Sequence, residues 1–216
     1  MGLRTMLGLK RRSALKAGLP PHWPTWFADK SFTSDWASSN FPTWAVVLSE
    51  FRNQHVEVLE IGSWEGRSAI FFLEFLPLSH ITCIDTFQGQ PERASSTPSI
   101  VQFVEARFDA NLSPYGNRME KMKMRSDEAL RSLTLARRAF DVVLIDGSHD
   151  RDDVALDTKL SWPMLRPQGV LIWDDYEGRS GEPADRRPKP AIDAFLAAHD
   201  DCTELRRGYQ VIVRRK

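Results

Sequence analysis

The sequence predicts an α/β fold with a mostly parallel sheet that ends in an antiparallel hairpin. From residue 56 onward, short apolar or β-branched runs alternate with longer segments of helical periodicity, as is typical of parallel strands joined by right-handed crossovers. After residue 176, the segments CTELR and YQVIVRR are separated only by the tight turn Arg207-Gly208, so their strands must be antiparallel. A chain of 216 residues can bury one sizeable core and is too short for two full catalytic domains.

The individual elements follow from this alternation. Pro42 stands at a first-turn position before a run of apolar residues, which predicts a helix leading into the first strand. The expected strands span residues 56–61, 80–85, 118–124, 140–146 and 169–174, and the hairpin brings the total to seven. The expected helices span residues 64–76, 98–112, 127–138 and 151–165, with Thr97 as the cap of the second, and a further helix runs from Pro190 to His199.

The N-terminal part of the chain has a different character. The first 19 residues carry five Lys and Arg side chains and no acid, and the proline-rich stretch LPPHWPTW at 19–26 predicts a stiff connector. We therefore expect residues 1–41 to form a basic arm and connector, and residues 42–216 to form the catalytic domain. The arm permits a short amphipathic helix, either solvated or packed on a partner, or used in membrane contact or targeting.

Composition narrows the function classes. The 29 Lys and Arg balance 29 Asp and Glu, so net charge gives no support to nucleic-acid binding. The longest apolar run, AIFFLEFL, is interrupted by Glu74 and is far shorter than the roughly 20 residues of a membrane span. Two cysteines form no disulfide framework and fit a reducing compartment, so we expect a cytoplasmic protein. The sequence leaves open whether the chain forms a homo-oligomer.

A glycine motif follows the first strand. It reads Glu60-Ile-Gly62-Ser-Trp64-Glu-Gly66-Arg-Ser68 and lies where a parallel sheet opens its cofactor crevice. Glycines there let a ligand approach the backbone, although a plain turn between strand and helix would have the same composition. Asp85 ends the second strand, where an acid in such folds accepts hydrogen bonds from ribose hydroxyls; its alternative role is to cap the next loop.

Three carboxylates end neighbouring strands. Asp146 follows the fourth strand, and Asp174 and Asp175 follow the fifth, so they are expected to converge at one edge of the sheet. Their repulsion is costly without a cation, and an all-oxygen set favours Mg²⁺ first, then Mn²⁺ or Ca²⁺. Alternatively, one aspartate caps the next helix and another pairs with an arginine.

His149 lies three residues after Asp146. An imidazole with a reference pKa of about 6.5 can take a proton from a hydroxyl near neutrality, which makes His149 the candidate general base. The alternative is a solvated loop histidine.

Together these motifs resemble those of the class I S-adenosylmethionine-dependent methyltransferases. The likeness covers residues 42–216 and rests on VLEIGSWEG, ITCIDTFQG, RSDEAL, FDVVLIDGSHD and PQGVLIWDDY. The spacing is most similar to that of the metal-dependent O-methyltransferases of the catechol and macrolide-sugar types, and IDTFQG and IDGSHD favour the sugar type. The resemblance implies a Rossmann-like methyltransferase fold, with S-adenosylmethionine and a divalent cation as cofactors.

The resemblance also implies roles for single residues. Glu60, Gly62 and Gly66 would border the methionine part of the cofactor, with Trp64 and Ser68 near its carboxylate or amino group. Asp85 would hold the ribose. Ser126 and Asp127 match the position beside the adenine ring, although they would equally serve as a helix start. The ion held by the three aspartates would bind the oxygens of the acceptor.

The expected function is therefore metal-assisted methyl transfer to a hydroxyl of a small molecule, with a sugar as one candidate. A nicotinamide-dependent oxidoreductase is the enzyme alternative, but it expects Gly-x-Gly-x-x-Gly and leaves the three aspartates unexplained. The other alternative is a catalytically inactive subunit of the same fold that binds a partner through the basic arm.

Overall fold

The computed structural model describes residues 18–89 and 98–216. The five basic side chains of the arm and the predicted cap Thr97 lie outside the described residues. None of the helices in the described part of the chain is long and apolar enough to cross a membrane.

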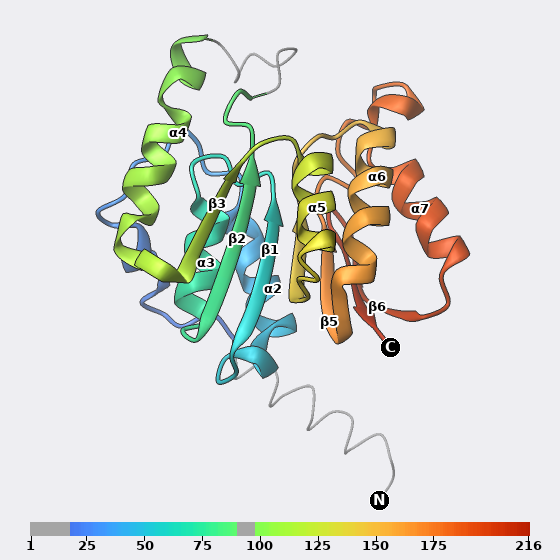
Figure 1. The fold of residues 1–216 in the computed structure, drawn as a ribbon, viewed down its shortest axis with the longest axis horizontal. Coiled ribbons are helices and arrows are strands. Elements are labelled where there is room, and N and C mark those ends of the chain that lie inside the picture. The colour runs from blue at the N-terminus through green and yellow to red at the C-terminus, as the bar shows by residue number, and fades with distance from the viewer. Residues whose placement is uncertain (1–17, 90–97) are drawn as a thin grey trace, which may run out of the picture.

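A seven-stranded sheet forms the centre of the molecule (Figure 1). Its order is β3-β2-β1-β4-β5-β7-β6; neighbours from β3 to β5 are parallel, and β7 is antiparallel to both β5 and β6. These findings confirm the predicted fold class and the C-terminal hairpin. The strands are β1 (Val56–Ile61), β2 (Ser79–Asp85), β3 (Met119–Lys123), β4 (Phe140–Ile145), β5 (Leu165–Trp173), β6 (Cys202–Arg207) and β7 (Val211–Arg215).

Helices cover both faces of the sheet (Figure 1). One face carries α2 (Phe41–Val47), α3 (Arg67–Phe75) and α4 (Pro98–Leu112), and the other carries α5 (Ser126–Leu135), α6 (Arg151–Ser161) and α7 (Lys189–Ala198). Short 3-10 turns occupy Trp23–Phe27, Ser38–Asn40, Ser49–Phe51, Ser113–Arg118, Trp162–Met164 and Ala184–Arg186.

Three predicted helix boundaries differ from the structure for local reasons. The helix expected from residue 64 begins at Arg67, because Trp64 and Gly66 adopt positive φ angles of 47° and 83°. The helix expected to reach 138 ends at Leu135, two residues before a positive φ at Arg137. The helix expected to reach 165 ends at Ser161, since a proline at 163 offers no amide hydrogen to continue it.

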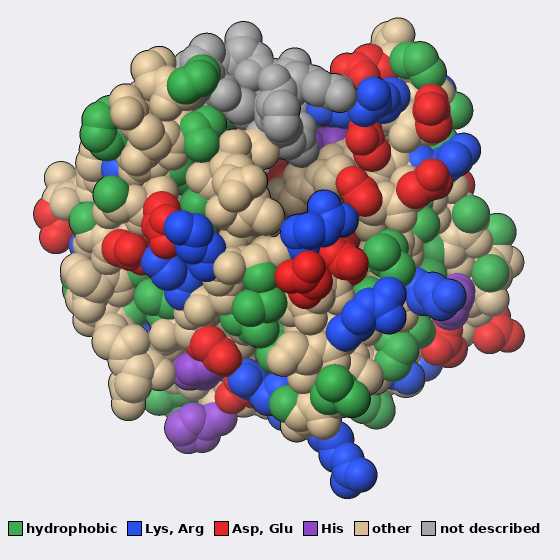
Figure 2. Space-filling model, turned by 45° about the horizontal axis from the view of Figure 1, so that its top comes forward, with side chains coloured by type: hydrophobic (Ala, Val, Ile, Leu, Met, Phe, Trp, Pro, Cys, Tyr) green, Lys and Arg blue, Asp and Glu red, His purple; other side chains and the backbone are tan. Residues whose placement is uncertain are grey.

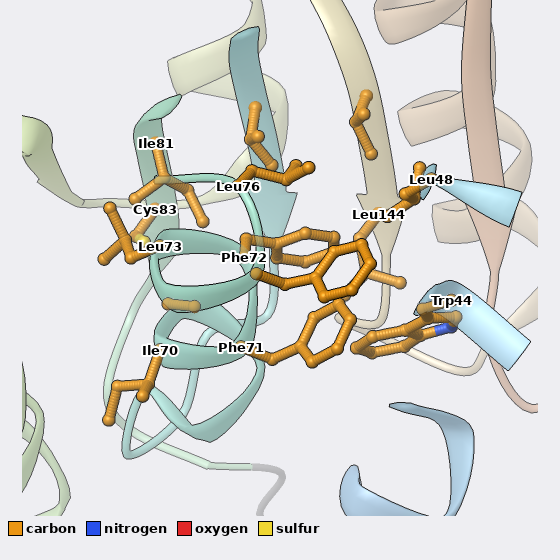
Figure 3. Close-up of a cluster of buried hydrophobic side chains, with 14 of the residues drawn as sticks. Trp44, Leu48, Ile70, Phe71, Phe72, Leu73, Leu76, Ile81, Cys83 and Leu144 are labelled. Atoms are coloured by element: carbon orange, nitrogen blue, oxygen red, sulfur yellow. The ribbon is translucent and has the colours of Figure 1, made fainter. Parts of the chain in front are cut away.

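Aromatic side chains dominate the core on the α3 face (Figure 3). Phe72 stacks on Trp44 of α2 with ring centroids 5.4 Å apart, and Phe71 stacks on Phe41 at 4.6 Å. Both phenylalanines point from α3 toward α2 (Figure 3). Ring packing, together with the burial of aliphatic side chains, therefore holds the short helix α2 in place.

The described part of the proline-rich connector packs on this same face. Phe27 is buried and stacks on Phe41 with ring centroids 5.7 Å apart, and Trp26 contacts Phe71 at 6.3 Å. Residues before 42 therefore contribute to the folded core, while a domain boundary at residue 42 stays a prediction.

Candidate functional site

A cavity of about 910 Å³ opens at the carboxyl ends of β1, β2, β4 and β5. Figure 2 looks toward this face, where the surface is hollowed between acidic and basic side chains. The loops that follow these strands supply most of its lining, in agreement with the general location of ligands in open parallel sheets.

The glycine loop after β1 is tightly packed. Gly62 has a φ of 90°, and a Cβ there would lie 2.1 Å from the carbonyl oxygen of Asp146, so only glycine lets β1 and β4 continue side by side into the site. Gly66 has a φ of 83°, and its Cβ would lie 2.5 Å from Cδ2 of Leu112 on α4. Both positions thus require glycine, because a side chain there would collide with neighbouring residues of the protein.

Asp85 is held by the backbone of two loops. Its Oδ2 accepts a hydrogen bond from the Trp64 amide at 2.7 Å, and its Oδ1 accepts one from the Phe87 amide at 2.6 Å. Burial raises the pKa of Asp85, and these amide donors act in the opposite direction.

The carboxylates after β4 and β5 converge on the same cavity. Single ligand atoms of Asp146, His149 and Asp175 all lie within 4.8 Å of one another, a spacing that could hold a metal ion. Asp174 lines the cavity beside them, and burial together with the charge of Asp146 raises its pKa to about 8. Burial also raises the pKa of Asp146.

His149 stands between two of these carboxylates. Its Nε2 lies 2.5 Å from Oδ2 of Asp175 and 3.8 Å from Oδ1 of Asp146, and its side chain is 9% exposed. Burial lowers the pKa of His149, but the contacts with Asp146 and Asp175 outweigh it and raise the pKa to about 9. The structure therefore places His149 inside the acidic cluster and not on a solvated loop.

Two residues of the C-terminal hairpin support this cluster and were not identified from the sequence. Gln210 donates through Nε2 to Oδ1 of Asp174 at 2.9 Å, while its Oε1 accepts a hydrogen bond from the indole of Trp44 at 2.7 Å. The indole can only donate, so it fixes the orientation of the Gln210 amide. Tyr209 donates its hydroxyl to Oδ1 of Asp175.

Some residues predicted to bind the cofactor line the cavity and others do not. Gly62, Trp64, Asp85 and Ser126 line it, and so do all residues predicted for the metal and base roles. The remaining four are not among its lining residues: Glu60, Gly66, Ser68 and Asp127.

Glu60 and Asp127 have other surroundings in the described structure. Glu60 is fully buried, and burial raises its pKa to about 7. Asp127 lies in the first turn of α5 and forms an ion pair with Arg125.

The cavity also has a wall that the sequence did not suggest. Three residues of the segment that the sequence assigned to the connector line it: Asp35, Trp36 and Ser39. No motif marks these positions, because their contacts with the glycine loop are distant in sequence.

Comparisons with known proteins agree with this arrangement. A family model described as a methyltransferase domain matches residues 59–176. An uncharacterized protein of Acanthamoeba polyphaga mimivirus is 22% identical over 153 residues, which is 70% of this chain and 64% of that protein.

Two solved structures share the fold. The MycE methyltransferase from the mycinamycin biosynthetic pathway, solved with Mg and SAH, has a TM-score of 0.61 at 18% identity, covering 89% of this chain and 52% of MycE. An O-methyltransferase from Bacillus cereus, solved with SAH, has a TM-score of 0.62 at 17% identity, covering 94% and 91%. The chain thus spans about half the length of MycE. These likenesses confirm the predicted fold and the resemblance behind it.

Proposed function

The chain belongs to the methyltransferase domain family, and from this premise we propose that it transfers a methyl group from S-adenosylmethionine to a hydroxyl oxygen of a small molecule, assisted by a divalent cation. The observation that carries the proposal is one cavity that joins the glycine loop and Asp85 to the carboxylates of Asp146 and Asp175. A cofactor half and an acceptor half then share a single space, which methyl transfer between two bound molecules requires.

In the cofactor half, Asp85 accepts hydrogen bonds from the ribose hydroxyls, because both of its oxygens already lie in fixed positions set by backbone amides. Gly62 and Trp64 border the methionine part, and Ser126 lies on the adenine side. The SAH found in the Bacillus cereus relative supports S-adenosylmethionine as the cofactor.

In the acceptor half, the donor set fits a hard divalent cation. Carboxylate oxygens of Asp146 and Asp175 lie close together, and Asp174 lines the same cavity. Burial is the main cause of the raised pKa of Asp174, and the charge of Asp146 adds a repulsion that a cation would relieve. The Mg found in MycE supports the same choice. A bound divalent cation supplies positive charge that makes a nearby hydroxyl more acidic.

The chemical step needs little from the protein beyond alignment and proton removal. The acceptor oxygen attacks the methyl carbon, the bond between that carbon and the sulfonium sulfur breaks, and the electron pair stays on sulfur. Neutral His149 takes the hydroxyl proton on Nε2, the atom that faces Asp146 and Asp175. Because these carboxylates raise the pKa of His149 to about 9, the neutral form becomes available as the pH rises toward that value.

The acceptor half suits a hydroxylated molecule such as a sugar. Its lining is polar and includes Asp150, Arg179 and Arg186, with both arginines paired to Asp150. Such groups exchange hydrogen bonds with hydroxyls readily.

The test is transfer of a labelled methyl group from S-adenosylmethionine to a panel of sugars and catechols, with and without a chelator. We expect transfer to at least one hydroxyl compound that stops with chelator and returns with Mg²⁺. Full methyl transfer in excess chelator would show that the reaction needs no divalent cation. SAH binding without transfer to any compound would favour a catalytically inactive subunit, and binding of a nicotinamide cofactor in place of SAH would favour the oxidoreductase.

A further inference from the structure

Residues 31–39, here called the N-terminal strap, are fastened to the glycine loop through Glu65. The Glu65 side chain is 1% exposed and accepts two hydrogen bonds from Thr33, from its amide at 2.6 Å and from its hydroxyl at 2.5 Å. Arg107 of α4 adds an ion pair at 2.7 Å. A buried carboxylate bound by three donors is held firmly, so the strap, the loop and α4 form one unit at this point.

Asn111 provides a second fastening. This buried α4 side chain donates through Nδ2 to the carbonyl oxygens of Ser31 and Glu65, both at 2.9 Å, and its Oδ1 accepts the amide of Ser31 at 2.9 Å. One amide side chain therefore satisfies backbone groups of both the strap and the glycine loop.

Arg67 fastens the other end of the strap. Its guanidinium forms an ion pair with Asp35 at 2.8 Å and donates through Nε to the hydroxyl of Ser38 at 3.0 Å. The same group lies over the rings of Phe27 and Phe32, at 4.6 and 4.7 Å from their centroids. The strap is thus tied at one end to the loop between β1 and α3 and at the other to the first residue of α3.

Between these fastenings, Trp36 lines the cavity. Its ring centroid lies 5.9 Å from that of Trp64 in the glycine loop, and the residue is 56% exposed. A ligand that covers a large, solvent-exposed ring removes apolar surface from water, and this burial makes binding more favourable. A ring already held in position loses little conformational freedom when the ligand binds.

We propose that the N-terminal strap is part of the cofactor site and that Trp36 is a binding residue that packs with Trp64 over bound S-adenosylmethionine. The proposal rests on the proposed function, since it assumes that this cavity takes the cofactor. It extends the site to a segment before residue 42, where the sequence predicted only a connector.

The first test is calorimetric titration of SAH into Trp36→Ala, Trp36→Phe and the control Phe103→Ala. Phe103 is similarly exposed, at 49%, and lies outside the cavity. We expect Trp36→Ala to bind SAH about tenfold more weakly, Trp36→Phe to retain most of the affinity, and the control to match the wild type. All three should unfold at the wild-type temperature, because neither ring is buried.

The second test concerns the fastening itself. Thr33→Val removes the hydroxyl that donates to Glu65 while keeping the amide, and we expect it to weaken SAH binding by about fivefold through a less fixed strap. SAH affinity that is unchanged in both Trp36→Ala and Thr33→Val would overturn the proposal. If the wild type bound no SAH at all, the proposed function would fail as well. If the wild type binds SAH, and Asp85→Ala weakens this binding but Trp36→Ala does not, only the role of the strap is refuted.

Discussion

Asp85 and Asp174 both follow parallel strands and line the same cavity, yet the chain surrounds them differently. Asp85 receives backbone amides on both oxygens, foremost from Trp64 and Phe87. Asp174 receives one side-chain amide, from Gln210, and faces the charge of Asp146. Burial raises the pKa of both groups, but donors oppose the shift at Asp85, whereas a neighbouring carboxylate adds to it at Asp174 and the pKa reaches about 8.

The difference shows what each end of the cavity is built to bind. An acid already stabilised by amides needs no counter-ion and can accept hydrogen bonds from a neutral partner such as a ribose. A group of carboxylates that repel one another is stabilised when a cation binds between them. The two ends should therefore respond independently to substitution, and the following predictions test that independence.

The largest effect is expected at the carboxylate end. The Asp174→Asn, Asp175→Asn double variant should lose about a thousandfold in methyl transfer, because a cation typically supplies several kcal/mol of transition-state stabilisation. Its affinity for SAH should match the wild type. Undiminished turnover would contradict the metal role, and the exposed Asp200→Asn serves as the control.

His149→Ala should lower turnover by about 10²- to 10⁴-fold, the usual contribution of a positioned base. Steady-state rates together with Mn²⁺ and SAH titrations would check this. Unchanged affinities with a lower rate would support the base role. A parallel loss of Mn²⁺ affinity would make His149 a metal ligand, as its 2.5 Å contact with Asp175 allows.

Asp85→Ala should weaken SAH binding by about 1.5 to 3 kcal/mol, or roughly 10- to 150-fold, without changing Mn²⁺ affinity. The physical reason is the loss of charge-assisted hydrogen bonds to the ribose. Calorimetry gives both constants, and equal SAH affinity in the variant would reject the ribose assignment.

A third buried acid, Asp157 of α6, sharpens the comparison because it has neither amide support nor a place in the cavity. Asp157 is 2% exposed, and burial raises its pKa to about 7. The folded protein then keeps a proton that the unfolded chain releases at its pKa of about 3.8, so stability should fall as pH rises from 4 to 7 and level off above 7.

Asp157→Asn should reduce this slope and not abolish it, because Glu60 and Asp174 also have raised pKa values. The variant should gain about 2 to 4 kcal/mol relative to the wild type between pH 4 and pH 8. Urea unfolding at the two pH values measures the difference. If the variant keeps the same dependence of stability on pH as the wild type, that dependence comes from groups other than Asp157.

The smallest effect is expected from deletion of residues 1–17. The proline-rich connector separates this stretch from the core, so cooperative unfolding and SAH affinity should stay within error of the wild type. Loss of a cooperative transition would show that the arm belongs to the folded unit.

The sequence predicted the parts of the site that follow directly from strand order. Asp85 ends β2, Asp146 follows β4 and Asp175 comes two residues after β5. Parallel strands bring their carboxyl ends to one edge of the sheet, so the order of the strands places these acids together. Gly62 also lines the cavity, although the close approach of the Asp146 carbonyl is by itself sufficient to require glycine there.

The residues that the sequence did not reveal act across long separations. Gln210 joins Trp44 to Asp174, and Trp44 lies 166 positions away from it. Trp36 reaches the cavity only because Glu65 and Arg67 hold the strap, and no periodic pattern records such contacts. The pattern of strands along the sequence therefore predicted which acids lie at the edge of the sheet. The other residues that line the cavity are placed by contacts between segments distant in sequence.

The most direct test of the account is paired titration of Mn²⁺ and SAH into Asp85→Asn and Asp175→Asn. Independent ends predict that Asp85→Asn loses SAH affinity by about tenfold or more and keeps Mn²⁺ affinity, while Asp175→Asn shows the reverse. Wild-type Mn²⁺ affinity in Asp175→Asn, or equal loss of both ligands in both variants, would contradict a cavity with one amide-held acid for the cofactor and a separate carboxylate cluster for the cation.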